Sequence, residues 1–325
     1  MRVLVPGGCG YIGSTTARLL RARGHEVMVF DNFSTGHAGA WDGPCARVDL
    51  TDAAALRSAL AGAGIFDGVI HFAARAYVGE SVTQPLRYWR ENLLPVLHLC
   101  EALPGVPFIF SSTCAIYGQP DAERLHEDLP KAPVNPYGAT KLAAERLLAD
   151  RAAAGQGGYA ALRYFNAAGA EPDGSHGEHH DPEERLIPRA VRAALQLGPP
   201  IQIYGGDWPT PDGTCVRDYV HVLDLAAAHL AALDRLRGGG GSGAWNLGTG
   251  RGASVLEVVA AVERAAGAPV PRQVGLRRAG DPTRLVADPS RAVRDLGWRP
   301  RFEDLDEIVQ TAVSWFRKHP TGYAS

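Results

Sequence analysis

Thr113, Tyr137 and Lys141 are residues whose types and spacing could together remove a proton from an alcohol. A phenol has a pKa of about 10, so it needs a nearby positive charge to act as a base at neutral pH. Tyr137 and Lys141 are four residues apart, which places them on one face of a helix. A Tyr-x-x-x-Lys pair occurs by chance in many helices, so the surrounding elements must decide whether this one is functional.

Two local elements are predicted to position these side chains. The apolar run 108–110 predicts a strand that ends near Thr113, whose hydroxyl could hydrogen-bond the group being deprotonated. Asn135 is a good N-cap and Pro136 suits a first helical turn, so a helix should begin there and end by Gly155.

The N-terminal segment predicts a nucleotide-binding turn. A strand over residues 2–5 is followed by Gly7, Gly10 and Gly13 and then by a helix over 14–23. Glycines at this spacing allow a tight turn and let the backbone approach a pyrophosphate at the helix N-terminus. The strand before and the helix after supply the context that such a turn requires.

The second predicted strand, over 26–30, ends in Asp31, which lies 18 residues after Gly13. A carboxylate at this point hydrogen-bonds the adenine ribose and repels a 2′-phosphate, so NAD is predicted in preference to NADP. Asp49 could reach the adenine edge; alternatively, Asp49 or Thr51 only caps the following helix.

Strands and helices continue to alternate through the first half of the chain. Further strands are predicted at 46–50, 68–74 and 159–165, with helices at 52–61 and 88–101. This alternation predicts an α/β fold with a doubly wound parallel sheet, a Rossmann fold, whose ligand lies at the C-terminal ends of the strands.

A smaller C-terminal α/β domain is predicted to bind the substrate. We expect residues 1–165 to form the dinucleotide-binding domain, with a returning segment near 215–245, and residues 166–325 to form mainly the second domain. Arg217 and Arg278 could clamp a diphosphate, because guanidinium groups match phosphate oxygens in pairs. Taken singly, each arginine is more often part of a surface ion pair.

The loop over 169–184 contains Glu178, His179, His180 and Asp181, which raises the question of a metal site. No second ligand cluster complements these residues. A mobile, solvated loop is therefore the favoured interpretation, and no metal is predicted.

Composition excludes several partners. The net charge of −2 provides no basic surface for nucleic acid or a membrane, and no apolar run approaches the ~20 residues of a membrane span. The N-terminus passes directly into a strand, which argues against a signal peptide. The five cysteines are scattered without CxxC spacing, so we expect reduced thiols in a cytoplasmic protein.

With these residues assembled, the chain resembles the extended short-chain dehydrogenase/reductase family, and within it the UDP-hexose 4-epimerases, from end to end. The resemblance rests on eight blocks: 7–14 (GGCGYIGS), 31–32 (DN), 78–81 (VGES), 111–113 (SST), 137–141 (YGATK), 163–166 (RYFN), 212–219 (DGTCVRDY) and 245–248 (WNLG). Related dehydratases carry an Asp-Glu pair after the threonine, where this chain has Cys114 and Ala115.

The resemblance implies a mechanism and a set of roles. Tyr137 would take the proton of the sugar 4-hydroxyl while carbon 4 gives a hydride to NAD, and the 4-keto sugar would turn over before hydride returns. Thr113 would bridge tyrosine and sugar, and Lys141 would bind the nicotinamide ribose and lower the pKa of the tyrosine. The other implied cofactor contacts are Gly7, Gly10, Tyr11, Ile12, Gly13, Asp31, Asn32, Asp49, Leu50, Phe72, Ala73, Ala74, Asn92, Ser111 and Tyr164. The implied substrate contacts besides Thr113 are Asn166, Leu186, Tyr204, Arg217, Tyr219, Arg278 and Asp281.

Three positions depart from the family pattern. Ala76, beside Arg75, stands where some members have a lysine that contacts the cofactor, and Arg185 stands where an asparagine lies near the substrate phosphates. Leu285 falls on a specificity position, where a bulky tyrosine restricts the substrate and a small residue admits N-acetylhexosamines.

The resemblance favours interconversion of UDP-glucose and UDP-galactose by a homodimer packed through the helices of Asn92 and Tyr137. The alternatives are a 4-epimerase of another nucleotide sugar (UDP-N-acetylglucosamine, UDP-xylose or UDP-arabinose, UDP-glucuronate), a catalytically silent NAD-binding regulator, and a dehydrogenase that releases NADH.

Overall fold

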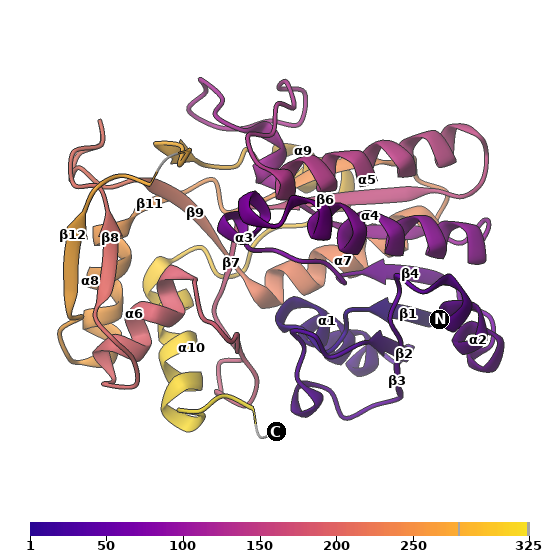
Figure 1. Ribbon diagram of the computed structural model, residues 1–325, viewed down its shortest axis with the longest axis horizontal. Helices are drawn as coiled ribbons and strands as arrows, with labels where there is room; N and C mark the ends of the chain where they lie inside the picture. The colour runs from indigo at the N-terminus through magenta and orange to yellow at the C-terminus, as the bar shows by residue number, and fades with distance from the viewer. Residues whose placement is uncertain (279, 324–325) are drawn as a thin grey trace.

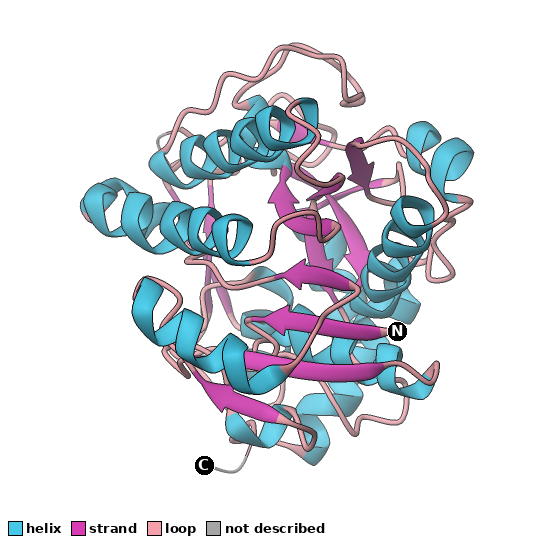
Figure 2. Ribbon diagram, turned by 90° about the vertical axis from the view of Figure 1, so that its right-hand side faces the viewer, coloured by secondary structure: helices cyan, strands magenta, loops and turns pink. Residues whose placement is uncertain are grey.

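A seven-stranded parallel sheet forms the centre of the protein, a computed structural model of which describes residues 1–278 and 280–323 (Figures 1 and 2). In spatial order the strands are β10 (Gly243–Leu247), β6 (Tyr159–Tyr164), β5 (Phe108–Thr113), β4 (Gly68–His71), β1 (Arg2–Pro6), β2 (Glu26–Asp31) and β3 (Cys45–Arg47). The order reverses direction between β1 and β4, so the predicted doubly wound α/β fold is confirmed.

Helices cover both faces of the sheet because successive strand residues point to opposite sides. Val3 and Val5 of β1 pack in the core beneath α1 (Tyr11–Ala22) and α7 (Val222–Arg237). Leu4, between them, packs on the other face. That face is covered by α2 (Ala53–Ala63), α4 (Pro85–Ala102) and α5 (Pro136–Ala153).

The second half of the chain builds a smaller α/β layer beside the sheet, on the left of Figure 1. Its strands are β7 (Asn166–Ala168), β8 (Ile201–Tyr204), β9 (Val216–His221), β11 (Gly252–Ser254), β12 (Arg272–Gly275) and β13 (Arg284–Leu285). Its helices α6 (Leu186–Ala194), α8 (Val255–Ala266) and α10 (Leu305–Lys318) share one apolar core. The short elements are α3 (Val78–Thr83), α9 (Ser290–Leu296), η1 (Ala38–Ala40) and η2 (Cys114–Tyr117).

The stretch expected to return to the first domain divides between the two layers. Strand β9 pairs with β7, β11 and β13 in the smaller sheet, whereas α7 covers the large sheet and β10 extends it beside β6. The domain boundaries themselves remain a prediction.

The expectation of a solvated loop over 169–184 is wrong for its central residues. His176 is 2% exposed and Glu178 is 3% exposed. The indole Nε1 of Trp315, in α10, donates to the carbonyl of Glu178 at 2.8 Å. The loop is thus packed against the C-terminal helix, a contact between residues 137 positions apart.

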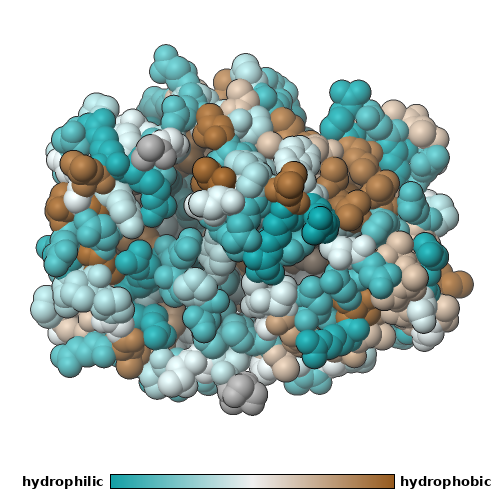
Figure 3. All heavy atoms as spheres, in the orientation of Figure 1, coloured by the Kyte–Doolittle hydropathy of each residue, from teal (hydrophilic) through white to brown (hydrophobic). Residues whose placement is uncertain are grey.

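Apolar side chains reach the surface along α3 and α4. Val82, Leu86 and Trp89 are exposed, and Leu86 is 78% exposed. Brown spheres gather over the region of α4 in Figure 3. Among the residues described, no helix is both long and apolar enough to cross a membrane.

Candidate active site

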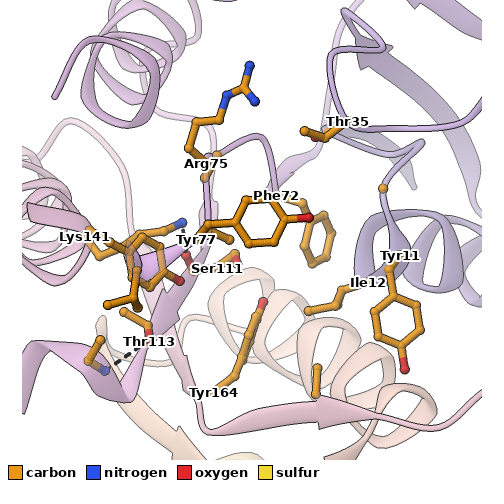
Figure 4. A pocket seen from close by; sticks show the side chains of 18 of the residues that line it. Tyr11, Ile12, Thr35, Phe72, Arg75, Tyr77, Ser111, Thr113, Lys141 and Tyr164 are labelled. Carbon is orange, nitrogen blue, oxygen red and sulfur yellow. Dashed lines mark hydrogen bonds between the residues drawn. The ribbon is translucent and has the colours of Figure 1, made fainter. Parts of the chain in front are cut away.

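A cavity of about 850 Å³ opens at the C-terminal ends of the strands and is lined by residues of both halves (Figure 4). Of the predicted cofactor positions, those at the cavity wall are Gly7, Gly10, Tyr11, Ile12, Gly13, Asp31, Asn32, Asp49, Leu50, Phe72, Ala73, Ala74, Ser111, Tyr137, Lys141 and Tyr164. Of the predicted substrate positions, those at the wall are Thr113, Asn166, Leu186, Arg217, Tyr219, Asp281 and the specificity residue Leu285.

The glycine-rich turn leaves no room for a side chain at Gly7 or Gly13. Gly7 has φ +78°, and a Cβ there would lie 2.4 Å from the backbone nitrogen of Ala73. A Cβ on Gly13 would lie 2.2 Å from the carbonyl oxygen of Gly7. The backbone therefore forms the cavity wall directly, at the N-terminus of α1, which is the arrangement that accepts a pyrophosphate.

Asp31 is anchored beside this turn. Its Oδ2 accepts from the amide of Cys9 at 2.9 Å and its Oδ1 from the amide of Phe33 at 2.8 Å. Burial raises the pKa of Asp31 although these amides oppose the shift. A carboxylate oxygen accepts more than one hydrogen bond, so Asp31 retains capacity for ribose hydroxyls.

Asp49 lines the cavity next to Asp31 but turns its carboxylate to Thr51, with contacts of 2.9 Å to the amide and 2.8 Å to Oγ1. The expectation that Asp49 or Thr51 caps α2 is wrong, because Asp52 is the N-cap and accepts from the amides of Ala54 and Ala55.

The three candidate catalytic residues meet at one end of the cavity. Thr113 is the last residue of β5, and Tyr137 lies in the first turn of α5, which Asn135 caps through the amide of Gly138 at 2.8 Å. Lys141 is 2% exposed and its Nζ donates to the carbonyl of Ser111 at 2.7 Å. Figure 4 shows Thr113, Ser111 and Lys141 on the same side of the pocket.

The protein alone does not lower the pKa of Tyr137. Burial raises it, while the Thr113 hydroxyl and the charge of Arg185 oppose the rise. Burial also lowers the pKa of Lys141 to about 7, which weakens the cation expected to favour the phenolate. The predicted lowering therefore rests on the positive charge that oxidised nicotinamide would bring.

Asn92 is 1% exposed and lies behind the cavity wall rather than in it. Its Oδ1 accepts from the amide of Arg75 at 2.7 Å, and its Nδ2 donates to the Arg75 carbonyl and to Thr140 Oγ1, both at 3.1 Å. It thus joins α4, the segment that contains Ala76, and α5. A direct cofactor contact by Asn92 stays a prediction.

Tyr164 and His229 form a buried pair beneath the cavity. The Nδ1 of His229 donates to the carbonyl of Leu225 at 2.7 Å, so its Nε2 accepts the Tyr164 hydroxyl. Burial lowers the pKa of His229 to about 4, which keeps it a neutral acceptor. Tyr164 is thereby held with its ring toward the pocket (Figure 4).

Two predicted substrate residues lie outside the cavity wall. The guanidinium of Arg278 lies 4.2 Å from the ring centre of Tyr204, and Tyr204 is exposed. Within the wall, Asn166 Nδ2 donates to the carbonyl of Asp218 at 3.2 Å, and Arg217 donates to the carbonyl of Val216 at 2.8 Å. The structure thus brings Arg217 to the cavity wall and leaves Arg278 outside it, against Tyr204.

Sequence reasoning missed the network that holds Arg185 in the wall. Its guanidinium donates to Glu178 at 2.7 Å, and His180 lies 3.2 Å from Glu178 and 3.5 Å from Glu183. Burial would lower the pKa of His180, but the two carboxylates raise it. Glu178, His180 and Glu183 are close enough to share a cation, yet Arg185 already supplies a positive charge there. The clustering of Glu178 and His180 in the sequence is a signal of this network, but the sequence alone favours a solvated loop there.

Comparisons with known proteins agree with this site. Residues 3–248 match the model of the NAD dependent epimerase/dehydratase family. The chain is 43% identical to the UDP-glucose 4-epimerase of Halalkalibacterium halodurans, across 100% of this chain and 98% of that protein.

Solved structures give the same result. A crystal structure of a UDP-glucose 4-epimerase superposes with a TM-score of 0.96 at 42% identity, covering 100% of both chains. The UDP-glucose 4-epimerase of Brucella ovis in complex with NAD superposes with a TM-score of 0.92 at 48% identity, covering 97% of this chain and 98% of that one. The close glycine turn, the anchored Asp31 and the buried Lys141 fit a bound dinucleotide. The chain therefore belongs to the NAD dependent epimerase/dehydratase family, with NAD as its cofactor.

Proposed function

We propose that this protein interconverts UDP-glucose and UDP-galactose by inverting carbon 4 of the sugar. The observation that carries the proposal is the meeting of Thr113, Tyr137 and Lys141 in one wall of a cavity whose opposite wall is the glycine-rich turn. Several relatives that match this chain over nearly its full length are UDP-glucose 4-epimerases.

Tyr137 acts as the base in this proposal. Bound NAD supplies the acceptor for the hydride of carbon 4 and the donor that returns it. Tyr137 takes the proton of the 4-hydroxyl and gives it back at the end of the cycle, and Thr113 hydrogen-bonds the same oxygen. Lys141 would hold the nicotinamide ribose. Thr113 and Lys141 are buried and Tyr137 is half-buried, which limits the access of water to the proton transfer.

The nucleotide must stay bound while the 4-keto sugar turns over. Arg217 and Arg278 would clamp the diphosphate, because two guanidinium groups can each take a pair of phosphate oxygens. The rest of this grip is assigned to Asn166, Leu186, Tyr204, Tyr219 and Asp281. Because these residues would bind the nucleotide at a distance from Tyr137, the sugar would remain free to rotate.

A second candidate is a 4-epimerase of another nucleotide sugar. Leu285 favours keeping this candidate, because it is 9% exposed, lines the cavity and is intermediate in size between the side chains that exclude and admit N-acetyl groups. A panel of UDP-sugars distinguishes the two.

We further propose that the protein is a cytoplasmic homodimer. Val82, Leu86 and Trp89 expose apolar surface along α3 and α4, where Figure 3 shows hydrophobic residues gathered. Replacing Leu86 by Glu should convert the dimer to a monomer in sedimentation analysis. A wild-type protein that sediments as a monomer contradicts the proposal. The five free thiols support a reducing compartment.

The direct test is incubation of the purified protein with UDP-galactose, without added cofactor, followed by chromatography of the nucleotide sugars. We expect UDP-glucose to appear without a net increase in absorbance at 340 nm. We expect the Tyr137→Phe variant to form no UDP-glucose. If nothing converts until NAD is added, the alanine at position 76 explains weak retention. An increase in absorbance at 340 nm would instead indicate a dehydrogenase that releases NADH. A wild-type protein that converts none of the UDP-sugars would indicate a regulator.

A further inference from the structure

Two cysteines that are far apart in the sequence lie side by side near the cofactor site. The Sγ atoms of Cys9 and Cys45 are 3.9 Å apart. Cys9 is buried within the glycine-rich turn, whereas Cys45 is exposed at the start of β3. The pair therefore combines a thiol that solvent can reach with a second thiol directly behind it.

Cys45 differs electrostatically from the buried thiols of the protein. A hydrogen bond from the Cys9 thiol lowers the pKa of Cys45, although partial burial and the charge of Asp31 oppose this. Burial raises the pKa of Cys100 to about 11 and that of Cys114 to about 12. The thiolate is the reactive form and Cys45 is exposed, so we expect Cys45 to react first.

Cys9 is mechanically connected to the cofactor site through its backbone. Its amide donates to Asp31 Oδ2 at 2.9 Å, and its carbonyl accepts from the amide of His37 at 3.0 Å. The adjoining Gly8 packs so closely that a Cβ there would lie 2.6 Å from Val29 in β2. Because Gly8 packs directly against Val29, a displacement of Cys9 must also move the glycine-rich turn.

We propose that Cys9 and Cys45 form a redox-active dithiol whose reversible disulfide weakens the binding of NAD. A disulfide requires the two sulfur atoms to approach from 3.9 Å to about 2.05 Å. That approach pulls the glycine-rich turn toward β3 and disturbs the hydrogen bond between Cys9 and Asp31. The inference depends on the cofactor and not on which sugar is the substrate.

The reaction balances with a hydroperoxide as oxidant. The Cys45 thiolate attacks one oxygen of hydrogen peroxide and the O–O bond breaks. Cys45 becomes a sulfenic acid, and the other oxygen leaves as hydroxide, which a proton converts to water. The Cys9 sulfur then attacks the sulfenic sulfur, loses its proton and expels hydroxide as a second water. Two thiols lose two electrons and two protons, and one hydrogen peroxide becomes two waters. A small dithiol reductant reverses the reaction by exchange.

The chemical test is treatment of the full-length protein with one equivalent of hydrogen peroxide, followed by tryptic digestion without reductant. We expect a linked pair of peptides, residues 3–18 and 24–47, which contain Cys9 and Cys45. Free-thiol titration should fall from five to three and return to five with dithiothreitol. A linkage through Cys100, or between two chains, would overturn the proposal.

The functional test measures the NAD that the protein retains after oxidation and desalting. We expect the wild type to lose NAD at least tenfold faster when oxidised, and Cys45→Ser, whose side chain is exposed, to retain it equally before and after peroxide. Cys100→Ser serves as the matched control and should behave like the wild type. Formation of the disulfide with unchanged NAD retention would overturn the proposal.

Linkage provides an independent readout without turnover. If the disulfide weakens NAD tenfold, NAD must disfavour the disulfide by the same factor. In glutathione buffers, saturating NAD should then raise the midpoint potential of the dithiol by about 30 mV for that tenfold effect, because NAD stabilises the reduced form. An unchanged midpoint would overturn the coupling.

Discussion

Arg163 and Glu145 form a buried two-pronged ion pair between the sheet and the helix of the candidate base. Arg163 Nε donates to Glu145 Oε1 at 3.0 Å, and its Nη2 donates to Oε2 at 2.6 Å. Ser112 also donates to Glu145. Because Glu145 lies one turn after Lys141 on α5, this pair sets the position of Lys141 against β5 and β6.

Glu145→Gln should lower the free energy of unfolding by about 3–5 kcal/mol, because it leaves a buried guanidinium without its counter-charge. Asp150→Asn on the same helix is the matched control. Its partner Arg146 is 78% exposed, so we expect less than about 1 kcal/mol. The free energies of unfolding of both variants are compared by chemical denaturation. Equal losses in the two variants would contradict the role assigned to burial of the ion pair.

Lys141 should make stability depend on pH. Its pKa is about 7 in the folded protein and 10.5 in the absence of burial, so the unfolded chain binds more protons between these values. Stability gained by deprotonation is therefore absent below pH 7 and grows as the pH rises toward 10.5. Unfolding measured from pH 6 to 9 should show a stronger increase in the wild type than in Lys141→Met. Parallel curves would show that Lys141 is not buried as described.

Arg185 should shift the pH profile of turnover. Its charge opposes the burial that raises the pKa of Tyr137. In Arg185→Gln we expect the acidic limb of kcat against pH to move to higher pH, because the phenolate loses a stabilising cation. Arg185→Lys keeps the charge and should restore part of the profile. A fall in kcat without movement of the limb would assign Arg185 to binding alone.

Leu285 should control which sugars enter. Leu285→Ala opens space at the cavity wall, so we expect kcat/KM for UDP-N-acetylglucosamine relative to UDP-galactose to rise about tenfold. Leu285→Tyr should lower the same ratio. Because Leu285 is buried, the Ala variant should also lose about 2–5 kcal/mol of stability, so activity is measured well below its Tm. If the ratio of kcat/KM values changes in neither variant, Leu285 does not determine which sugars are accepted.

Much of the fold could be predicted because its signals are local. The glycines at 7, 10 and 13 and the four-residue spacing of Tyr137 and Lys141 are constraints that each segment carries within itself. The alternation of strands and helices then leaves few arrangements besides a doubly wound sheet. The boundaries were less certain: α1 begins at Tyr11, three residues before the predicted start, because Gly13 lies within the helix.

What the sequence by itself determined is therefore the α/β class, the dinucleotide turn and the identity of the residues that could do chemistry. Tertiary structure alone decided the burial of Glu178 beneath Trp315, the contact of Cys9 with Cys45 and the rise in the pKa of Tyr137. The physical reason is that conformational preferences act over a few neighbouring residues. Desolvation and contact depend instead on which distant segments the folded chain brings together.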